Sequence, residues 1–234
     1  SRPYMINIPI NLNNINCRIQ QALATTDRCI KDIILVAASK GQPSEAIRIA
    51  YALGQKHFGE NYLQEALKKQ QELSDLSDIC WHFIGPLQSN KARKIAENFD
   101  WVHTIDKAKI AEKLNISRQD NQPPLNVCIQ VNISEEESKS GLSVQECSEV
   151  STAVAALPRL NLRGLMTIPQ HNATEVEQRK TFKAMSKLLL RVRDSSPQLT
   201  TLDTLSMGMS SDLEAALQEG ATIIRVGSAI FGPR

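Results

Sequence analysis

Lys40 is the residue whose position points most directly to chemistry. It follows an apolar run, residues 33–38, that has the length and β-branched content of a buried strand, so an amine stands where the core ends. An amine that is partly withdrawn from water has a lowered pKa, and its neutral form attacks aldehydes to form a Schiff base. A solvated charge that merely ends the strand is the alternative interpretation.

Two segments near the end of the chain are candidates for surrounding an anion. They are "LSMGMSSDLEAAL" (205–217) and "RVGSAIFG" (225–232). Their small and hydroxyl residues are Ser206, Gly208 and Ser210 in the first segment, and Gly227 and Ser228 in the second. In (β/α)8 barrels the loops after strands 7 and 8 often bind phosphate, because backbone amides and a helix N-terminus can surround it. Either segment alone is weak support, since Gly and Ser are common in loops.

Arg225 interrupts an apolar run, residues 223–226, and a permanently charged guanidinium there needs a partner. That partner is either a carboxylate in the barrel or the ring nitrogen of a ligand. A lysine, a phosphate cradle and a donor to a ring nitrogen together describe pyridoxal 5′-phosphate (PLP).

The rest of the chain supplies elements that can position these groups. Apolar, β-branched-rich runs predict strands at 33–38, 57–59, 81–84, 101–105, 125–133, 160–166, 202–205 and 222–226. Helical spacing predicts helices at 12–24, 44–53, 63–73, 90–97, 107–114, 144–157, 176–193 and 212–218. This alternation predicts an α/β fold, a single (β/α)8 TIM barrel with an extra N-terminal helix, which occupies the whole of residues 1–234 as one domain. An open parallel sheet is the alternative, and no Gly-x-Gly-x-x-Gly follows the first strand to support it.

Local signals refine these elements. The two-residue period of a strand places Val36, Ala38 and Lys40 on one face, with the small Ala38 leaving space beneath the amine. Gly54 is expected as the residue after a helix C-cap, and Ser211-x-x-Glu214 has the pattern of a capping box.

The composition indicates which binding partners and which cellular compartment to expect. The formal net charge of +2 gives no reason to expect nucleic acid or a membrane surface, and no apolar run is long enough to cross a bilayer. Five scattered cysteines without a CxxC pair fit neither a disulfide framework nor a zinc site, so we expect reduced thiols that are mostly buried or inert, and a cytoplasmic protein. Residues 1–4, before Met5, are set aside as a cloning remnant, native sequence or a disordered end.

A metal-dependent hydrolase is a further alternative, because three histidines fall on predicted strands. These are His57, His82 and His103, but the sequence has no His-x-His pair and no carboxylate placed beside them. We therefore expect no metal.

Six longer motifs resemble those of a known family. They are "VAASK" (36–40), "FGENYLQEA" (58–66), "WHFIGPLQSNK" (81–91), "LRGLMTI" (162–168), "LSMGMSSDLEAAL" (205–217) and "IRVGSAIFG" (224–232). In this order they resemble the YggS/PROSC family of pyridoxal phosphate homeostasis proteins, which is related to the N-terminal barrel of bacterial alanine racemase. The resemblance extends from about residue 12 to residue 233.

The resemblance implies a set of cofactor-binding residues and no catalytic residues. It implies Lys40 as the Schiff-base lysine, Asn61 and Met166 near the cofactor, Arg225 at the pyridine nitrogen, and Ser206, Gly208, Gly227 and Ser228 around the phosphate. Taken by themselves, Asn61 could instead cap a helix and Met166 could be plain core. The roles of His82 and Asn90 in the 81–91 motif do not follow from the sequence, and packing or loop anchoring is the simplest explanation.

The resemblance also implies a function: control of intracellular PLP and of amino- and keto-acid balance, without established catalysis. It implies a monomer, with PLP-dependent apoenzymes as candidate recipients of the cofactor. An arginine at the ring nitrogen keeps that nitrogen unprotonated and weakens the electron sink on which PLP catalysis depends. The alternative is a Schiff-base enzyme, either a racemase-like PLP enzyme or a class I aldolase in which Lys40 attacks its substrate directly.

Overall fold

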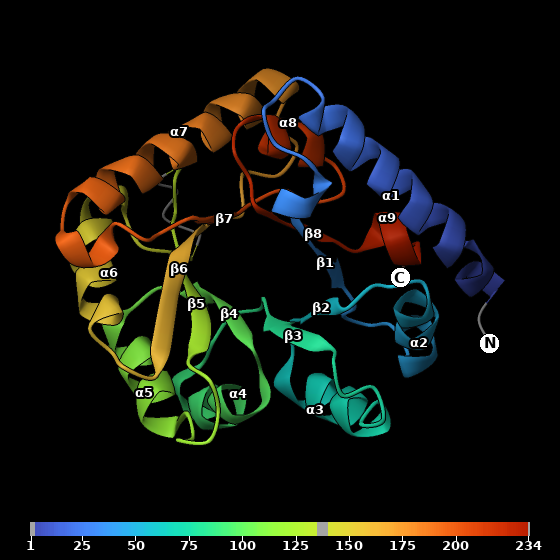
Figure 1. The fold of residues 1–234 in the computed structure, drawn as a ribbon, viewed down its shortest axis with the longest axis horizontal. Helices are drawn as coiled ribbons and strands as arrows, with labels where there is room; N and C mark the ends of the chain where they lie inside the picture. Colours follow the sequence, from blue (N-terminus) through green and yellow to red (C-terminus); the bar gives the residue numbers. More distant parts are fainter. Residues whose placement is uncertain (1–2, 135–139, 234) are drawn as a thin grey trace.

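The protein folds as a closed barrel of eight parallel strands inside a ring of helices (Figure 1), as a computed structural model shows for residues 3–134 and 140–233. The strands follow one another in chain order, and β1 pairs with β8 to close the barrel. Their bounds are β1 Ile34–Ala38, β2 His57–Glu60, β3 Cys80–Phe83, β4 Trp101–Ile105, β5 Leu125–Gln130, β6 Leu160–Met166, β7 Thr204–Ser206 and β8 Ile223–Val226.

The helices cover the outside of the barrel. The α-helices are α1 Ile8–Leu23, α2 Ser44–Ala52, α3 Leu63–Glu72, α4 Ala92–Asn98, α5 Ala108–Ser117, α6 Cys147–Ala155, α7 Glu175–Asp194, α8 Leu213–Gln218 and α9 Ser228–Phe231. Short 3-10 helices lie at Pro3–Asn7, Ile30–Asp32, Ser89–Lys91, Val144–Glu146 and Pro197–Leu199. No helix in the described part of the chain is long and apolar enough to cross a membrane.

The extra N-terminal helix α1 lies alongside α8 and α9 (Figure 1). Arg18 on α1 forms an ion pair with Glu214 on α8, with 2.6 Å between Arg18 Nε and Glu214 Oε2. Asn11 donates a hydrogen bond of 2.9 Å to the carbonyl of Ile230 on α9. These contacts attach α1 to α8 and α9, the helices that precede and follow β8.

The side chains pack in two layers. The larger core lies between the strands and the helices, where every strand contributes residues that are fully buried. A smaller cluster fills the inside of the barrel and consists of Val36, Trp101, Cys128, Met166 and Ile223. The inside of the barrel is therefore a packed core below its mouth, as expected for eight strands.

The predicted elements are confirmed, with differences at their ends. The eight strands and the leading helix occur in the predicted order. The seventh strand is Thr204–Ser206 and not 202–205, because Leu202 belongs to a turn in which its N–H bonds to the carbonyl of Leu199. The fifth strand ends at Gln130, three residues earlier than predicted.

One of the two capping predictions is confirmed and the other is wrong. Gly54 follows the C-cap of α2 with φ +100°, a conformation that favours glycine. The capping box at Ser211 does not form, because α8 begins at Leu213 with Asp212 as its N-cap. Glu214, which would have completed the box, binds Arg18 instead.

All five cysteines are free, as expected, but their burial varies. Cys128 and Cys147 are buried, Cys80 is half-buried, and Cys17 and Cys29 are exposed. Burial is confirmed for Cys128 and Cys147, and the inertness expected of the other thiols stays a prediction.

Candidate functional site

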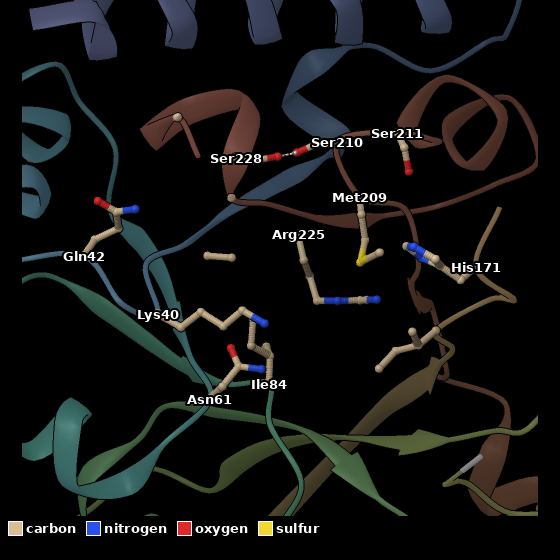
Figure 2. A pocket seen from close by; sticks show the side chains of 14 residues that line it. Lys40, Gln42, Asn61, Ile84, His171, Met209, Ser210, Ser211, Arg225 and Ser228 are labelled. Carbon is tan, nitrogen blue, oxygen red and sulfur yellow. Dashed lines mark hydrogen bonds between the residues drawn. The ribbon is translucent and has the colours of Figure 1, made fainter. Parts of the chain in front are cut away.

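The carboxyl ends of the strands surround a cavity of about 590 Å³, which we call the barrel-mouth cavity. Its lining residues are Ala38, Lys40, Gln42, Asn61, Ile84, Ile168, His171, Met209, Ser210, Ser211, Arg225, Gly227, Ser228 and Gly232. Figure 2 shows the side chains of Lys40 and Arg225 entering the cavity from neighbouring strands, with Asn61 below Lys40. This size and this position are those of a small-molecule site in a barrel.

The backbone on both sides of Lys40 is anchored by a buried charge cluster. Lys69 on α3 donates to the carbonyl of Ser39 at 2.7 Å, and Glu65 accepts from the N–H of Gly41. The Ser39 hydroxyl in turn donates to Glu60 at the end of β2. Glu60 and Glu65 of the motif at 58–66, together with Lys69, therefore hold the lysine-bearing turn in place.

The centre of this cluster is an ion pair between Lys69 and Glu60. Lys69 Nζ lies 3.0 Å from both carboxylate oxygens of Glu60 and 2.8 Å from Glu65 Oε1. Burial raises the pKa of Glu60, and the charge of Lys69 opposes that rise. A buried carboxylate and a buried ammonium thus compensate each other between the end of β2 and α3.

Arg225 is a buried cation of a different kind. Its guanidinium donates to Ser206 Oγ at 2.6 Å and to the carbonyl of Thr167 at 3.1 Å. No ion pair to Arg225 is found within residues 3–134 and 140–233, so the interpretation of a salt bridge with a barrel carboxylate is wrong. Burial lowers the pKa of Arg225 to about 10, opposed mainly by the charge of Asp212, and the group remains charged at neutral pH.

Three histidines continue the hydrogen-bonded chain from Ser206 through the inside of the barrel. His103 Nδ1 lies 2.7 Å from Ser206 Oγ, His103 Nε2 lies 2.9 Å from His82 Nδ1, and His82 Nε2 lies 2.9 Å from His57 Nδ1. Arg225 can only donate, so the Ser206 hydroxyl accepts from it and donates its own proton to His103. That direction places the proton of His103 on Nε2 and the proton of His82 on Nε2 in turn.

Asn61 has a buried acceptor without a partner. Its Oδ1 is enclosed and accepts no hydrogen bond from any described residue. The helix-cap interpretation is wrong, because Tyr62 is the N-cap of α3. Gly85 from the 81–91 motif packs on Asn61 so closely that an added Cβ would lie 2.1 Å from the Asn61 carbonyl oxygen. An orphaned polar atom that lines a cavity is a mark of a ligand site.

The predicted phosphate segments meet on the far side of the same cavity. Gly227 is the N-cap of the short helix α9, which begins at Ser228. Ser210 Oγ accepts from the Ala229 N–H at 3.3 Å and lies 3.5 Å from Ser228 Oγ (Figure 2). A Cβ on Gly227 would lie 3.2 Å from the carbonyl of Ala38, so this glycine lets the two strand ends approach.

The structure brings five of the eight predicted cofactor-binding residues to the cavity wall. These are Lys40, Asn61, Arg225, Gly227 and Ser228. Ser206 and Met166 are fully buried below the floor, the first bonded to Arg225 and the second in the inner core cluster. Gly208, with φ +107°, packs against Ala216 and Ile224, and its carbonyl accepts from the Arg225 N–H.

Sequence reasoning missed several lining residues. Gln42, Ile84, Ile168 and His171 follow strands β1, β3 and β6 in the chain. The rule that barrel chemistry gathers behind strand ends could have indicated them. Which of the many residues after a strand turn inward depends on loop conformation, and the sequence pattern does not encode that.

The 81–91 motif has three separate roles in the structure. His82 belongs to the histidine chain, and Gly85 packs on Asn61. Residues from Gly85 to Ser89 line a second cavity of about 710 Å³, which shares Asn61, Ile84 and Ile168 with the barrel-mouth cavity. Asn90 lies exposed in the 3-10 helix Ser89–Lys91.

This fold and this cavity define a barrel of the alanine racemase N-terminal type. The profile of the alanine racemase N-terminal domain matches residues 10–234. Alanine racemase from Corynebacterium glutamicum has the same fold, with a TM-score of 0.69 at 18% identity over 97% of this chain and 62% of the racemase.

Full-length relatives define the family more narrowly. The chain is 50% identical over 230 residues to the pyridoxal phosphate homeostasis protein of Pseudomonas aeruginosa, covering 98% of this chain and 97% of that protein. It is 47% identical over 232 residues to the pyridoxal phosphate homeostasis protein of Escherichia coli, covering 98% of both. The chain belongs to the family of pyridoxal phosphate homeostasis proteins, as its motifs predicted.

A solved structure with PLP is also similar to this chain. It is PipY of Synechococcus elongatus with PLP bound, which is 40% identical with a TM-score of 0.82 and covers 92% of this chain and 100% of its own. PipY without PLP is 39% identical with a TM-score of 0.86, over 96% of this chain and 100% of its own.

Proposed function

We propose that this chain binds PLP in the barrel-mouth cavity and serves in intracellular PLP homeostasis and amino- and keto-acid balance. The observation that carries the proposal is the meeting of two cations, Lys40 and Arg225, in one cavity whose wall also holds the orphaned Asn61 Oδ1. A PLP-bound relative at 40% identity and the homeostasis proteins at 47–50% identity support it.

The residues present fit this cofactor. PLP supplies an aldehyde that condenses with a lysine amine and a pyridine ring whose nitrogen can accept a hydrogen bond. Lys40 is the amine that we propose for the aldehyde, and Arg225 is the donor for the ring nitrogen. Ser228 offers a hydroxyl for the phosphate across the cavity from Lys40 (Figure 2), and Gly227 offers a backbone turn where the end of β8 approaches Ala38.

The three predicted residues below the floor act indirectly in this proposal. Ser206 holds the Arg225 guanidinium in orientation, and Gly208 accepts a hydrogen bond from the Arg225 backbone. Met166 fills the barrel core under the ligand. Their contribution is to fix the shape and the charge of the floor.

We propose that the protein carries PLP without catalysing a reaction, because Arg225 places a positive charge at the ring nitrogen. A guanidinium only donates hydrogen bonds, so it favours an unprotonated ring nitrogen and a weak electron sink. The relatives are named for homeostasis and not for a reaction. A cytoplasmic monomer that passes PLP to dependent apoenzymes is the form of this role that we propose.

One observation favours a second candidate, a racemase-like PLP enzyme. His171 lines the barrel-mouth cavity across from Lys40 (Figure 2), and a racemase uses two bases on opposite faces of its substrate. Incubation of the PLP-loaded protein with single L-amino acids, followed by chiral chromatography, tests this candidate. Formation of the D-enantiomer that is abolished by His171→Ala would establish it.

Absorption spectroscopy tests the proposed function. The protein, freed of endogenous cofactor, is titrated with PLP, and we expect a visible band that saturates at one equivalent. Lys40→Ala should lose the band, whereas Lys107→Ala, at an exposed lysine of the neighbouring cavity, should keep it. A saturable band that survives Lys40→Ala would contradict the proposal.

A further inference from the structure

We propose a second site, for Zn²⁺, at the opposite end of the barrel, built from His57, Cys80 and His82. His57 Nδ1, Cys80 Sγ and His82 Nε2 all lie within 4.8 Å of one another. His57 and Cys80 are paired neighbours at the first residues of β2 and β3, and His82 lies two residues further along β3 on the same face. Neither His57 nor Cys80 lines the barrel-mouth cavity, so this proposal does not rest on the proposed PLP function.

The distances are close to those of a tetrahedral zinc centre. Zinc binds histidine nitrogen at about 2.0–2.1 Å and thiolate sulfur at about 2.3 Å. Tetrahedral angles then require about 3.6 Å between a sulfur and a nitrogen ligand and about 3.3 Å between two nitrogens. Cys80 Sγ lies 3.6 Å from His82 Nε2, and His57 Nδ1 lies 2.9 Å from the same atom. Relative to these values the histidine pair must open by a few tenths of an ångström, and the third pair of atoms, Cys80 Sγ and His57 Nδ1, lies within 4.8 Å.

His82 is already oriented as a ligand by a second residue. Its Nδ1 is bonded to His103 Nε2 at 2.9 Å, which leaves Nε2 directed at His57 and Cys80. Metal-binding histidines usually hold their other nitrogen in such a bond, which fixes the ring orientation. When the metal binds Nε2, the single proton of His82 moves to Nδ1 and is donated to His103 Nε2, and the proton of His103 moves to Nδ1 and is donated to Ser206 Oγ, so both rings change tautomer and neither loses a proton.

The surroundings allow a cation to enter and favour it. His57 and Cys80 are half-buried, and His57 lines a cavity of about 270 Å³ between β1, β2 and α1. Asp100, whose carboxylate accepts from the Trp81 N–H at 2.8 Å, adds negative charge near both residues. Two imidazoles and one thiolate are a soft to borderline set that suits Zn²⁺, with water in the fourth position. Binding exchanges the Cys80 thiol proton for the metal.

Cobalt substitution tests this site in the full-length protein. The chain is treated with a chelator, freed of PLP, kept reduced and titrated with Co²⁺ and then with Zn²⁺. We expect one equivalent of Co²⁺ to produce visible d–d bands and a near-ultraviolet thiolate-to-cobalt band, both displaced by Zn²⁺. His103→Gln should weaken Zn²⁺ binding by about 10–100-fold, as is typical when the group that orients a metal-binding histidine is lost.

Two variants and one control make the test decisive. Cys80→Ser should abolish the thiolate-to-cobalt band, and His57→Gln, at a half-buried position, should weaken binding without preventing folding. Cys128→Ser removes a thiol that is buried inside the same barrel but does not belong to the His57–Cys80–His82 group, and it should leave the spectrum unchanged. Binding that is absent, or that is unaffected by both Cys80→Ser and His57→Gln, would overturn the proposal. PLP binding in either case is unaffected, so the two proposals fail separately.

Discussion

The barrel-mouth cavity receives two cations that are supported in opposite ways. The turn that carries Lys40 rests on a charge cluster, in which Lys69 meets Glu60 and Glu65 at 2.8–3.0 Å. Arg225 rests on neutral groups, the Ser206 hydroxyl and the Thr167 carbonyl. In the Lys69 cluster the buried charges are compensated by each other, whereas the charge of Arg225 meets no hydrogen-bonded carboxylate in the described chain.

This difference indicates a structural role for the Lys69 cluster and a ligand-binding role for Arg225. A compensated ion pair fixes a backbone position and leaves little field outside it. A buried guanidinium on neutral acceptors keeps its charge directed at the cavity, where an anionic or electron-rich ligand can use it. We therefore expect the Lys69 cluster to contribute to stability and Arg225 to contribute mainly to ligand affinity.

Removing Lys69 should have the largest effect on stability. Lys69→Met leaves the Glu60 carboxylate buried and uncompensated, which costs about 3–5 kcal/mol when one member of a buried pair is lost. Urea unfolding followed by circular dichroism measures this loss. Lys68→Met, at the exposed neighbour on the same helix, is the control and should change the free energy of unfolding by less than about 0.5 kcal/mol.

The stability deficit of Lys69→Met should depend on pH, with a sign that follows from the pKa of Glu60. Burial already raises the pKa of Glu60, and loss of the Lys69 charge removes the main influence that lowers it. A carboxyl whose folded pKa lies above its unfolded pKa stabilises the fold at low pH and loses that contribution as the pH rises through the folded value. The stability deficit of Lys69→Met should therefore be smaller at about pH 5 than at about pH 8. An equal deficit at both values would contradict this account of Glu60.

Ser206→Ala should have an intermediate effect. It leaves a buried donor of Arg225 unpaired and breaks the chain to His103, at a cost of about 1–3 kcal/mol. Thr204→Val on the same strand is the control, because the Thr204 hydroxyl bonds only to the largely exposed Asp203 among the described residues. If Ser206 positions Arg225, the alanine variant should also shift the visible band of bound PLP, which a merely structural serine would leave in place.

Arg225→Met should have the smallest effect on stability and a clear effect on binding. Replacing a buried charge by an apolar side chain of similar length is often neutral or stabilising. The free energy of unfolding without PLP should therefore be unchanged or higher, while PLP affinity falls. A loss of stability as large as that of Lys69→Met would mean that Arg225 and Lys69 are supported in the same way.

The sequence was informative where pattern and chemistry coincide. Alternating apolar runs predicted the barrel, and the strand period predicted that Ala38 and Lys40 face the same cavity. Lys69 was not singled out, because a lysine on a helix of polar residues has the pattern of a solvated side chain. Its burial depends on Glu60 and Ser39, which come from two other elements.

The hydrogen bonds of the histidine chain also could not be predicted from the sequence. His57, His82 and His103 were noted on predicted strands, but their hydrogen bonds depend on the register between neighbouring strands. Spacing alone puts Cys80 and His82 on one face of a strand, but the register that brings His57 beside Cys80 is set by the loops and helices that join the strands. The metal proposal could be made only after that register was known.

The most direct test of the central claim is to find the residue that PLP bonds. The protein is loaded with PLP, reduced with borohydride, digested and mapped by mass spectrometry. We predict a pyridoxyl-phosphate adduct on Lys40 at near-unit occupancy, which is lost in Lys40→Ala and retained in Lys107→Ala. An adduct on another lysine in the wild-type protein, or one of unchanged occupancy in Lys40→Ala, would contradict the account.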